Sequence, residues 1–178
     1  KQGASLIAKA LDLGREVRTA DFSGSIRAGV AALLGAFDSV RAGAVQRVLV
    51  IASDCRTAAP GSAAERAFGD GAAALLISSA KPMATLTAVH SVADEIIDVW
   101  RTEGDPYVRS WEERFVVQHG YRANVLEAVR GLLAKSRCAM GDFNKVVLYG
   151  PDARAHGELS RALDLPADQV LTVKEPAP

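Results

Sequence analysis

Two apolar runs separated by a glycine-rich segment constrain this chain most. Residues 46–53 and 72–77 have the composition of β-strands, and the Phe-Gly-Asp-Gly sequence that contains Gly69, Asp70 and Gly71 lies between them. Glycine tolerates positive φ and lets other backbone approach closely. We therefore expect Gly69 to Gly71 to form a turn packed against another part of the molecule, with Asp70 accepting backbone amides of its own turn.

The pattern before this strand pair predicts an α/β unit. Apolar residues recur at helical spacing over residues 2–13 and 25–41, while residues 17–22 alternate as in a short strand. A strand, a helix and a second strand in this order favour a right-handed crossover and a buried parallel sheet.

The later part of the chain restarts the alternation of helices and strands. The predicted elements are a strand at residues 84–92 that forms a hairpin with 72–77, an irregular segment at 94–114 rich in aromatic and charged residues, a helix at 117–135, a strand at 146–149, a helix ending at Leu163 and the start of a strand at 170–173.

Composition excludes several classes of protein. The chain has 178 residues, of which 49% are hydrophobic and 24% charged, and its formal net charge is zero, as expected for an ordinary globular core. No basic run is interleaved with aromatic residues, so we expect no nucleic-acid partner. No apolar stretch reaches the ~18 residues that span a bilayer, so we expect no membrane segment. Cys55 and Cys138 lack metal-ligand spacing, which predicts no metal site and a reducing, cytoplasmic location. Because the first residue is Lys1, we expect the sequence to be a piece of a longer protein.

Several short motifs, in the same order, resemble the central part of thiolase-superfamily condensing enzymes. They are residues 23–29 at a helix start, Ala-Gly-Ala-Val at 42–45, Ser-Asp at 53–54, Pro-Gly-Ser-Ala-Ala-Glu at 60–65 and Phe-Gly-Asp-Gly-Ala-Ala at 68–73. The likeness is to 3-oxoacyl-acyl-carrier-protein synthase III and, more closely, to the 3-hydroxy-3-methylglutaryl-CoA synthase branch. Residues 98–101, Asp-Val-Trp-Arg, look like the Asp-Phe-Trp-Arg of that branch, and residues 142–152 look like its Asp-Phe, strand, His-Gln-Pro-Asn segment.

The resemblance implies a fold and an assembly. The fold is α/β and thiolase-like, a fragment of an αβαβα subunit with a mixed, mostly parallel sheet packed by helices. Residues 1–93 would be the latter part of the N-terminal half, 94–115 an irregular excursion, and 116–178 the start of the C-terminal half. The family also implies a cytoplasmic homodimer in lipid metabolism, an acyl-CoA or acyl-carrier thioester as substrate without a resident cofactor, and a small partner with an OB-fold and a zinc ribbon.

The family's catalytic positions carry different residues here. Its members load an acyl group on a cysteine at the N-terminus of a buried helix, where the helix dipole lowers the thiol pKa, and use a histidine at a strand-to-helix turn. By the resemblance, the cysteine position falls on Ile26, directly after Ser25, and the histidine position falls on Tyr149. We expect Ile26 and Tyr149 to share a thioester-sized pocket without sulfur.

Several side chains are candidates for this pocket. Tyr149 is the predicted hydrogen-bond donor or acid/base, and Ser25 is either a nucleophile or only a helix cap. His156, one helical turn beyond Asp152, either faces the pocket or lies at the surface. The predicted substrate-binding residues are Ile26, Gly69, Asp70, Gly71, Trp100 and Asp152.

Three functions remain open at this point. The first is an acyl-CoA-handling condensing enzyme, similar to the 3-hydroxy-3-methylglutaryl-CoA synthase acyltransferases, with the usual cysteine and histidine replaced. A non-covalent aldol or retro-aldol reaction on a CoA thioester would need no sulfur nucleophile. The second is a catalytically silent subunit that supports an active partner. The third is an ordinary synthase that uses Cys55.

Overall fold

The chain forms two compact units in the computed structural model, which describes residues 2–171. The first unit contains residues 2–56 and 66–85, and the second contains residues 57–65 and 86–171. The short helix α3 (Ala63–Ala67) lies where the chain passes from the second unit back to the first. The three regions predicted from the resemblance stay a prediction.

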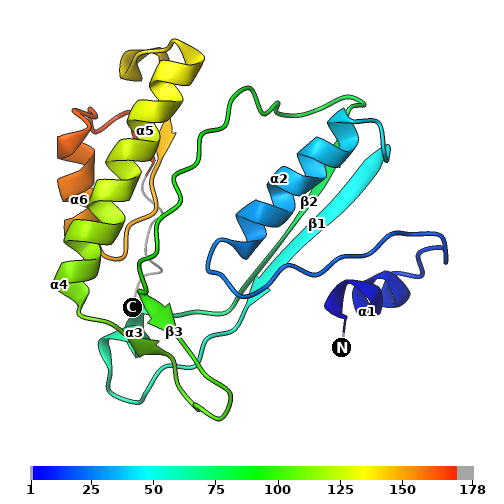
Figure 1. The fold of residues 1–178 in the computed structure, drawn as a ribbon, viewed down its shortest axis with the longest axis horizontal. Coiled ribbons are helices and arrows are strands. Elements are labelled where there is room, and N and C mark those ends of the chain that lie inside the picture. The colour runs from blue at the N-terminus through cyan, green and yellow to red at the C-terminus, as the bar shows by residue number, and fades with distance from the viewer. Residues whose placement is uncertain (1, 172–178) are drawn as a thin grey trace. The chain divides into compact units, whose positions relative to one another are not determined.

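A helix packed on a β-hairpin forms the core of the first unit (Figure 1). β1 (Arg47–Asp54) and β2 (Gly71–Ser78) pair antiparallel, with Arg47 opposite Ser78 and Asp54 opposite Gly71. α2 (Ala28–Arg41) covers one face of the hairpin, and α1 (Gly3–Ala10) precedes it in the chain. The buried centre consists of Ala36, Val50 and Ile77. The predicted helices and both strands of this glycine-linked pair are therefore confirmed.

The face of the hairpin opposite the Val50–Ile77 side is also apolar. Neighbouring side chains of a strand point to opposite faces, so Leu49 and Leu76, which lie opposite each other, alternate with the core residues. Leu76 is 64% exposed, whereas Ile77 is 9% exposed. The near-continuous apolar runs therefore have the pattern of strands that are covered on both faces, but α2 covers only one.

The predicted strand at residues 17–22 is wrong. This segment lies beside the start of α1, where the Asp21 carboxylate accepts from the backbone N–H groups of Gly3 at 2.6 Å and Ala4 at 2.8 Å. The hydroxyls of Ser5 and Thr19 are also within hydrogen-bond distance, at 2.9 Å. Side-chain bonds to a helix start thus hold the segment, and no described strand pairs with it.

A long helix with a π-helical centre forms one side of the second unit. α4 (Glu113–Phe115) continues into the π-helix η1 (Val116–Arg122) and then into α5 (Ala123–Ser136), which confirms the predicted helix. Glu112 caps its start by accepting from the backbone N–H of Phe115 at 2.6 Å. The helix ends at Ser136, and its C-cap Arg137 has φ of 56°.

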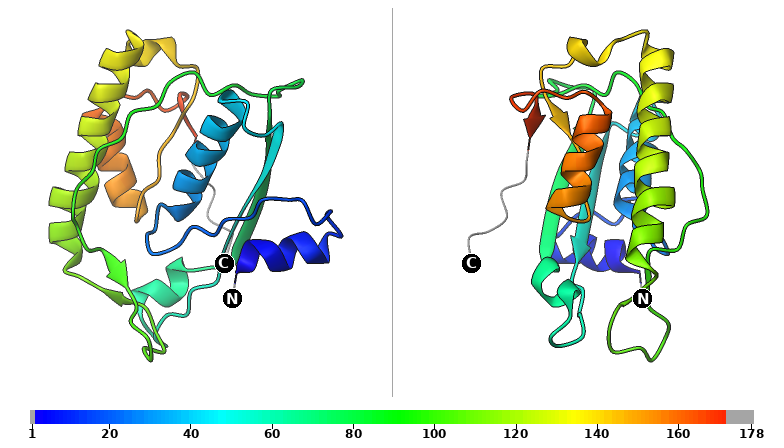
Figure 2. Two further views of the ribbon diagram at one scale, coloured as in Figure 1. Left: turned by 45° about the vertical axis from the view of Figure 1, so that its right-hand side comes forward. Right: turned by 90° about the vertical axis from the view of Figure 1, so that its left-hand side faces the viewer.

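A short parallel strand pair and a helix complete this unit. β5 (Val146–Val147) pairs with β6 (Val170–Leu171), and α6 (Ala153–Ala162) lies beside them and contacts η1 (Figure 2). The 3₁₀ helix η2 (Met140–Asp142) connects α5 to β5. Buried Gln169 donates to the carbonyl oxygens of Met140 at 2.9 Å and Phe143 at 2.5 Å. Residues 172–173 of the predicted last strand lie outside the described residues.

The predicted strand at residues 84–92 is also wrong, and so is its hairpin with 72–77. Residues 89–96 instead run along the long helix, in the opposite direction. Lys135 Nζ donates to the carbonyl oxygen of Val89 at 2.8 Å, and Asn124 Nδ2 donates to Asp94 at 3.0 Å. A methyl group at Gly131 would overlap the imidazole of His90. Contacts with the helix thus replace the pairing of strands.

The irregular segment of residues 94–114 contains one small hairpin. β3 (Val99–Trp100) pairs antiparallel with β4 (Arg109–Ser110). Among the described pairs, β1–β2 and β3–β4 are thus antiparallel and β5–β6 is parallel. The mixed α/β class is confirmed, with the parallel pair in the minority.

Candidate functional site

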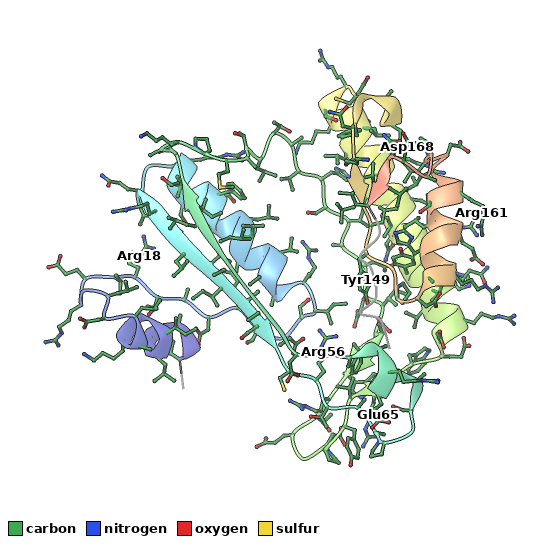
Figure 3. All side chains as sticks on the ribbon, turned by 180° about the vertical axis from the view of Figure 1, so that it is seen from behind. Arg18, Arg56, Glu65, Tyr149, Arg161 and Asp168 are labelled. Carbon is green, nitrogen blue, oxygen red and sulfur yellow. The ribbon has the colours of Figure 1, made fainter. Side chains whose placement is uncertain are left out.

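Tyr149 lies in the loop between β5 and α6 (Figure 3). Its side chain is 76% exposed, although it follows a strand and precedes a helix. The loop ends at Asp152, whose carboxylate accepts from the backbone N–H of Ala155 at 2.7 Å and so caps α6. The structure therefore presents a phenol at a strand-to-helix turn, where the resemblance places the family's histidine.

Tyr121 of the π-helix contacts Tyr149 in two ways. Its hydroxyl donates to the carbonyl oxygen of Tyr149. The two rings are perpendicular, with an interplanar angle of 85° and a centroid distance of 6.4 Å. Burial raises the pKa of Tyr121 to about 12, and the neighbouring Tyr149 and Asp152 add to this shift. Tyr121 is therefore a stable hydrogen-bond donor at neutral pH.

Gly150 of this turn packs against His156 of α6. A Cβ atom added at Gly150 would lie 2.6 Å from the Cβ of His156, so the turn needs glycine there. The backbone N–H of His156 donates to the carbonyl oxygen of Asp152 at 3.0 Å. The structure thus brings together three predicted site residues: Tyr149, Asp152 and His156.

Ser25 and Ile26 lie in the first unit, just before α2. The Ser25 hydroxyl accepts from the backbone N–H of Arg27 at 3.2 Å, and Ile26 is 67% exposed. The helix begins at Ala28, after both residues, and its N-cap is Arg27. Ser25 thus stabilises the turn that precedes the helix. The shared pocket of Ile26 and Tyr149 stays a prediction.

The turn at residues 69–71 differs from the expectation. Gly69, Asp70 and Gly71 are exposed, and a Cβ atom at either glycine would meet no described atom within 4 Å. Neither Gly69 nor Gly71 has positive φ. Gly71 is already a strand residue, which pairs with Asp54. The expected packed, positive-φ turn is therefore wrong. In this loop it is Gly61 that has positive φ, at 76°.

The Asp70 carboxylate raises the pKa of a nearby cysteine, Cys55. The thiol of Cys55 hydrogen-bonds the Asp70 carboxylate, and the charges of Asp70 and Asp54 lie nearby. The hydrogen bond contributes most, and together with the two charges it raises the pKa of Cys55 above its usual value. Since the thiolate is the nucleophilic form, Cys55 is poorly suited to form an acyl-enzyme.

Trp100 lies half-buried on the small β3–β4 hairpin, where it packs against Trp111 with a centroid distance of 6.3 Å. The adjoining loop is held by Asp105, whose carboxylate accepts from the Thr102 hydroxyl at 2.6 Å and pairs with Arg109 at 2.5 Å. These bonds lower the pKa of Asp105 to about 2. The hairpin is thus an ordered aromatic platform in the second unit.

Sequence reasoning did not assign Tyr121 to this site. Tyr121 lies in the π-helix η1, its contact with Tyr149 joins residues 28 positions apart, and no local residue pattern links the two. No described helix is long and apolar enough to cross a membrane. Among residues 2–171, no three His, Cys, Asp or Glu side chains gather as metal ligands would.

The sequence matches curated relatives over most of its length. It is 29% identical over 170 residues to the hydroxymethylglutaryl-CoA synthase of Methanothermobacter thermautotrophicus, which covers 96% of this chain and 49% of the relative. The corresponding enzyme of Archaeoglobus fulgidus is 32% identical over 154 residues, covering 86% of this chain and 44% of the relative. The chain is a homologue of the hydroxymethylglutaryl-CoA synthases. It spans about half the length of these relatives, and no family model matches it.

Solved structures give the fold of this synthase homologue. MvaS in complex with 3-hydroxy-3-methylglutaryl coenzyme A superimposes with a TM-score of 0.80 at 22% identity, covering 92% of this chain and 42% of MvaS. The 3-oxoacyl-(acyl carrier protein) synthase III of Pseudomonas aeruginosa gives a TM-score of 0.77 at 22% identity, covering 96% of this chain and 56% of that protein. The predicted thiolase-like fold and the resemblance to both enzyme groups are confirmed.

Proposed function

We propose that this synthase homologue acts on acyl-CoA thioesters by the carbon–carbon bond chemistry of condensing enzymes, with Tyr149 in place of the family's histidine. The observation that carries the proposal is the exposed phenol of Tyr149 at the β5–α6 turn, where the backbone carbonyl oxygen of Tyr149 accepts from the Tyr121 hydroxyl. The curated relatives that match this chain are hydroxymethylglutaryl-CoA synthases, which supports a CoA thioester as the class of substrate.

A non-covalent route is favoured by the residues of the first unit. Ile26 has no nucleophilic atom, and the Asp70 carboxylate opposes ionisation of Cys55. In an aldol addition, a base removes a proton from the α-carbon of the thioester, and that carbon attacks a ketone or aldehyde. The carbonyl oxygen then takes a proton from an acid, a role that the phenol of Tyr149 would fill. Retro-aldol cleavage reverses these steps, and neither direction transfers the acyl group to sulfur.

The proposal includes the remaining features implied by the family. We assign the protein to cytoplasmic lipid metabolism as a homodimer, with the CoA thioester as substrate and no resident cofactor. The small partner with an OB-fold and a zinc ribbon would deliver or share the thioester. Gly69, Asp70, Gly71, Ile26, Trp100 and Asp152 are the proposed contacts to the substrate.

Turnover by the full-length protein tests the proposal. Purified protein is incubated with acetyl-CoA and acetoacetyl-CoA, and separately with 3-hydroxy-3-methylglutaryl-CoA, and the products are separated by chromatography. We expect product formation, and we expect Tyr149→Phe to lower kcat by about a hundredfold or more, since acid/base groups contribute about 10²- to 10⁴-fold. Tyr107→Phe, which removes a phenolic hydroxyl elsewhere, is the matched control. Failure of the folded wild-type protein to bind or convert any of these thioesters would favour a silent subunit instead.

A further inference from the structure

The turn that carries Tyr149 is restrained on three sides. The Tyr121 hydroxyl holds the carbonyl oxygen of Tyr149, the Asp152 carboxylate caps α6, and Gly150 packs tightly on His156. Two of these restraints come from within the turn and its own helix. The Tyr121 hydrogen bond is different, because it links the turn to a helix 28 positions away in the sequence.

Tyr121 lies in the π-helical segment of the long helix. In an α-helix each residue advances the angular position by about 100°, so one extra residue in a turn rotates every later side chain by about that amount. η1 (Val116–Arg122) includes Tyr121 in its last turn, within an otherwise α-helical segment. Single π-turns inside α-helices occur frequently at functional sites. Here Tyr121 is half-buried, and its ring contacts the ring of the candidate acid Tyr149.

The geometry restricts both the backbone and the ring of Tyr149. The hydrogen bond fixes its peptide group, and the perpendicular ring of Tyr121, with its centroid 6.4 Å away, blocks part of the space into which the phenol could rotate. Among residues 2–171, Tyr149 makes no further hydrogen bond or ring contact, and it is 76% exposed. Without Tyr121, an exposed side chain of this kind would sample several rotamers.

We propose that Tyr121 is a positioning residue, which holds the phenol of Tyr149 in one orientation toward the thioester. This inference rests on the proposed function for its catalytic consequence only. The restraint on Tyr149 is a separate physical claim, and it can be measured without substrate.

The test compares Tyr121→Phe with the wild-type full-length protein. The substitution removes the hydrogen-bond donor and keeps the ring. Tyrosine labelled with ¹³C at Cζ gives an NMR signal for each ring, and Tyr149→Phe identifies the signal of Tyr149. We expect one sharp Tyr149 signal in the wild type, and a shifted or broadened one in Tyr121→Phe. If the protein turns thioesters over, kcat should fall about ten- to a hundredfold in this variant while KM changes little, because misplacing a catalytic group by about 1 Å costs on this order.

Ser136→Ala is the matched control for a merely structural effect. It removes a hydroxyl that donates to the carbonyl oxygen of Leu132 at 2.6 Å on the same long helix, far along the sequence from Tyr121. It should leave the Tyr149 signal and kcat unchanged. An unchanged Tyr149 signal in Tyr121→Phe would overturn the inference, as would a changed signal with an unchanged kcat. If the wild type converts no thioester, the proposed function fails, whereas the NMR signal still decides whether Tyr121 positions Tyr149.

Discussion

Neighbouring carboxylates determine what Cys55 can do. The residue is exposed, directly after β1, so its position alone would allow reaction with a substrate. Asp54 is paired with Arg56 at 2.6 Å, which offsets part of its charge, and Asp70 hydrogen-bonds the thiol itself. Asp70 is therefore the main reason that the pKa of Cys55 is raised. The same residue that the sequence suggested as a turn former suppresses the chain's most accessible thiol.

Asp70→Asn should make Cys55 more reactive. The substitution removes a negative charge that destabilises the thiolate, so the pKa of Cys55 falls and more thiolate is present at neutral pH. Each unit of pKa corresponds to about a tenfold change in thiolate fraction, so we expect alkylation by iodoacetamide at pH 7 to accelerate several-fold. Peptide mass spectrometry follows Cys55 and Cys138 separately in one sample. Cys138 contacts the Ser136 carbonyl and serves as the internal control. An unchanged or slower rate at Cys55 would contradict the assignment of Asp70.

Among the elements, residues 17–22 and 84–92 show why a local sequence pattern does not fix a strand. Neither segment pairs with a described strand, and each is held by hydrogen bonds between a side chain and the backbone. Asp21 is occupied with the start of α1, and Lys135 reaches the Val89 carbonyl from the long helix. Such contacts join residues 18 and 46 positions apart. Local periodicity carries no information on them, which is why these two strand predictions failed while the amphipathic helices were found.

Close packing along the long helix depends on Gly120. A Cβ atom there would lie 2.8 Å from Cγ2 of Ile96, a branched side chain held in the segment that runs along the helix. Overpacking costs about 1–3 kcal/mol, and alanine in a helix recovers up to about 1 kcal/mol relative to glycine. We therefore expect Gly120→Ala to lower the free energy of unfolding by about 1 kcal/mol, measured by urea denaturation monitored by circular dichroism.

Gly157→Ala provides the comparison, because it changes the same residue types in α6 without a clash. The nearest atom to its new methyl group would be Nη1 of Arg161 at 3.6 Å, an ordinary contact. This variant should gain about 0.5–1 kcal/mol from helix propensity. Equal effects of the two substitutions would show that Ile96 gives way at little cost.

For the molecule as a whole, the sequence was sufficient to predict the family resemblance but not the contacts between residues of the candidate site. The ordered motifs from residue 23 to residue 152 led to the thiolase-like fold, which both the relatives and the solved structures confirm. The same order places Tyr149 at the position of the family's histidine, and its role there stays a prediction. Tyr121 could not be placed in this way, because its contact with Tyr149 joins residues 28 positions apart. The proximity of Cys55 and Asp70 likewise depends on the strand register that pairs Asp54 with Gly71. The order of motifs is enough to predict a fold, whereas contacts between residues of different elements become known only from the three-dimensional structure.

The covalent and non-covalent routes differ in what acetyl-CoA leaves behind on the full-length protein. A synthase of the usual kind holds the acetyl group as a thioester, whereas the proposed aldol route leaves every side chain unmodified. Protein incubated with excess acetyl-CoA, quenched in acid and digested should therefore show unmodified peptides around Ser25, Cys55 and Cys138, while product still forms in the parallel turnover assay. An acetyl group on Cys55 that is lost in Cys55→Ala together with turnover would restore the ordinary synthase. An acetyl ester on Ser25 would instead mean that the hydroxyl before α2 has taken over the role of the missing thiol. In either case the acid function of Tyr149 would have to be judged on the separate effect of Tyr149→Phe on kcat, because a proton donor is needed for the carbonyl oxygen whether or not the acyl group is held covalently.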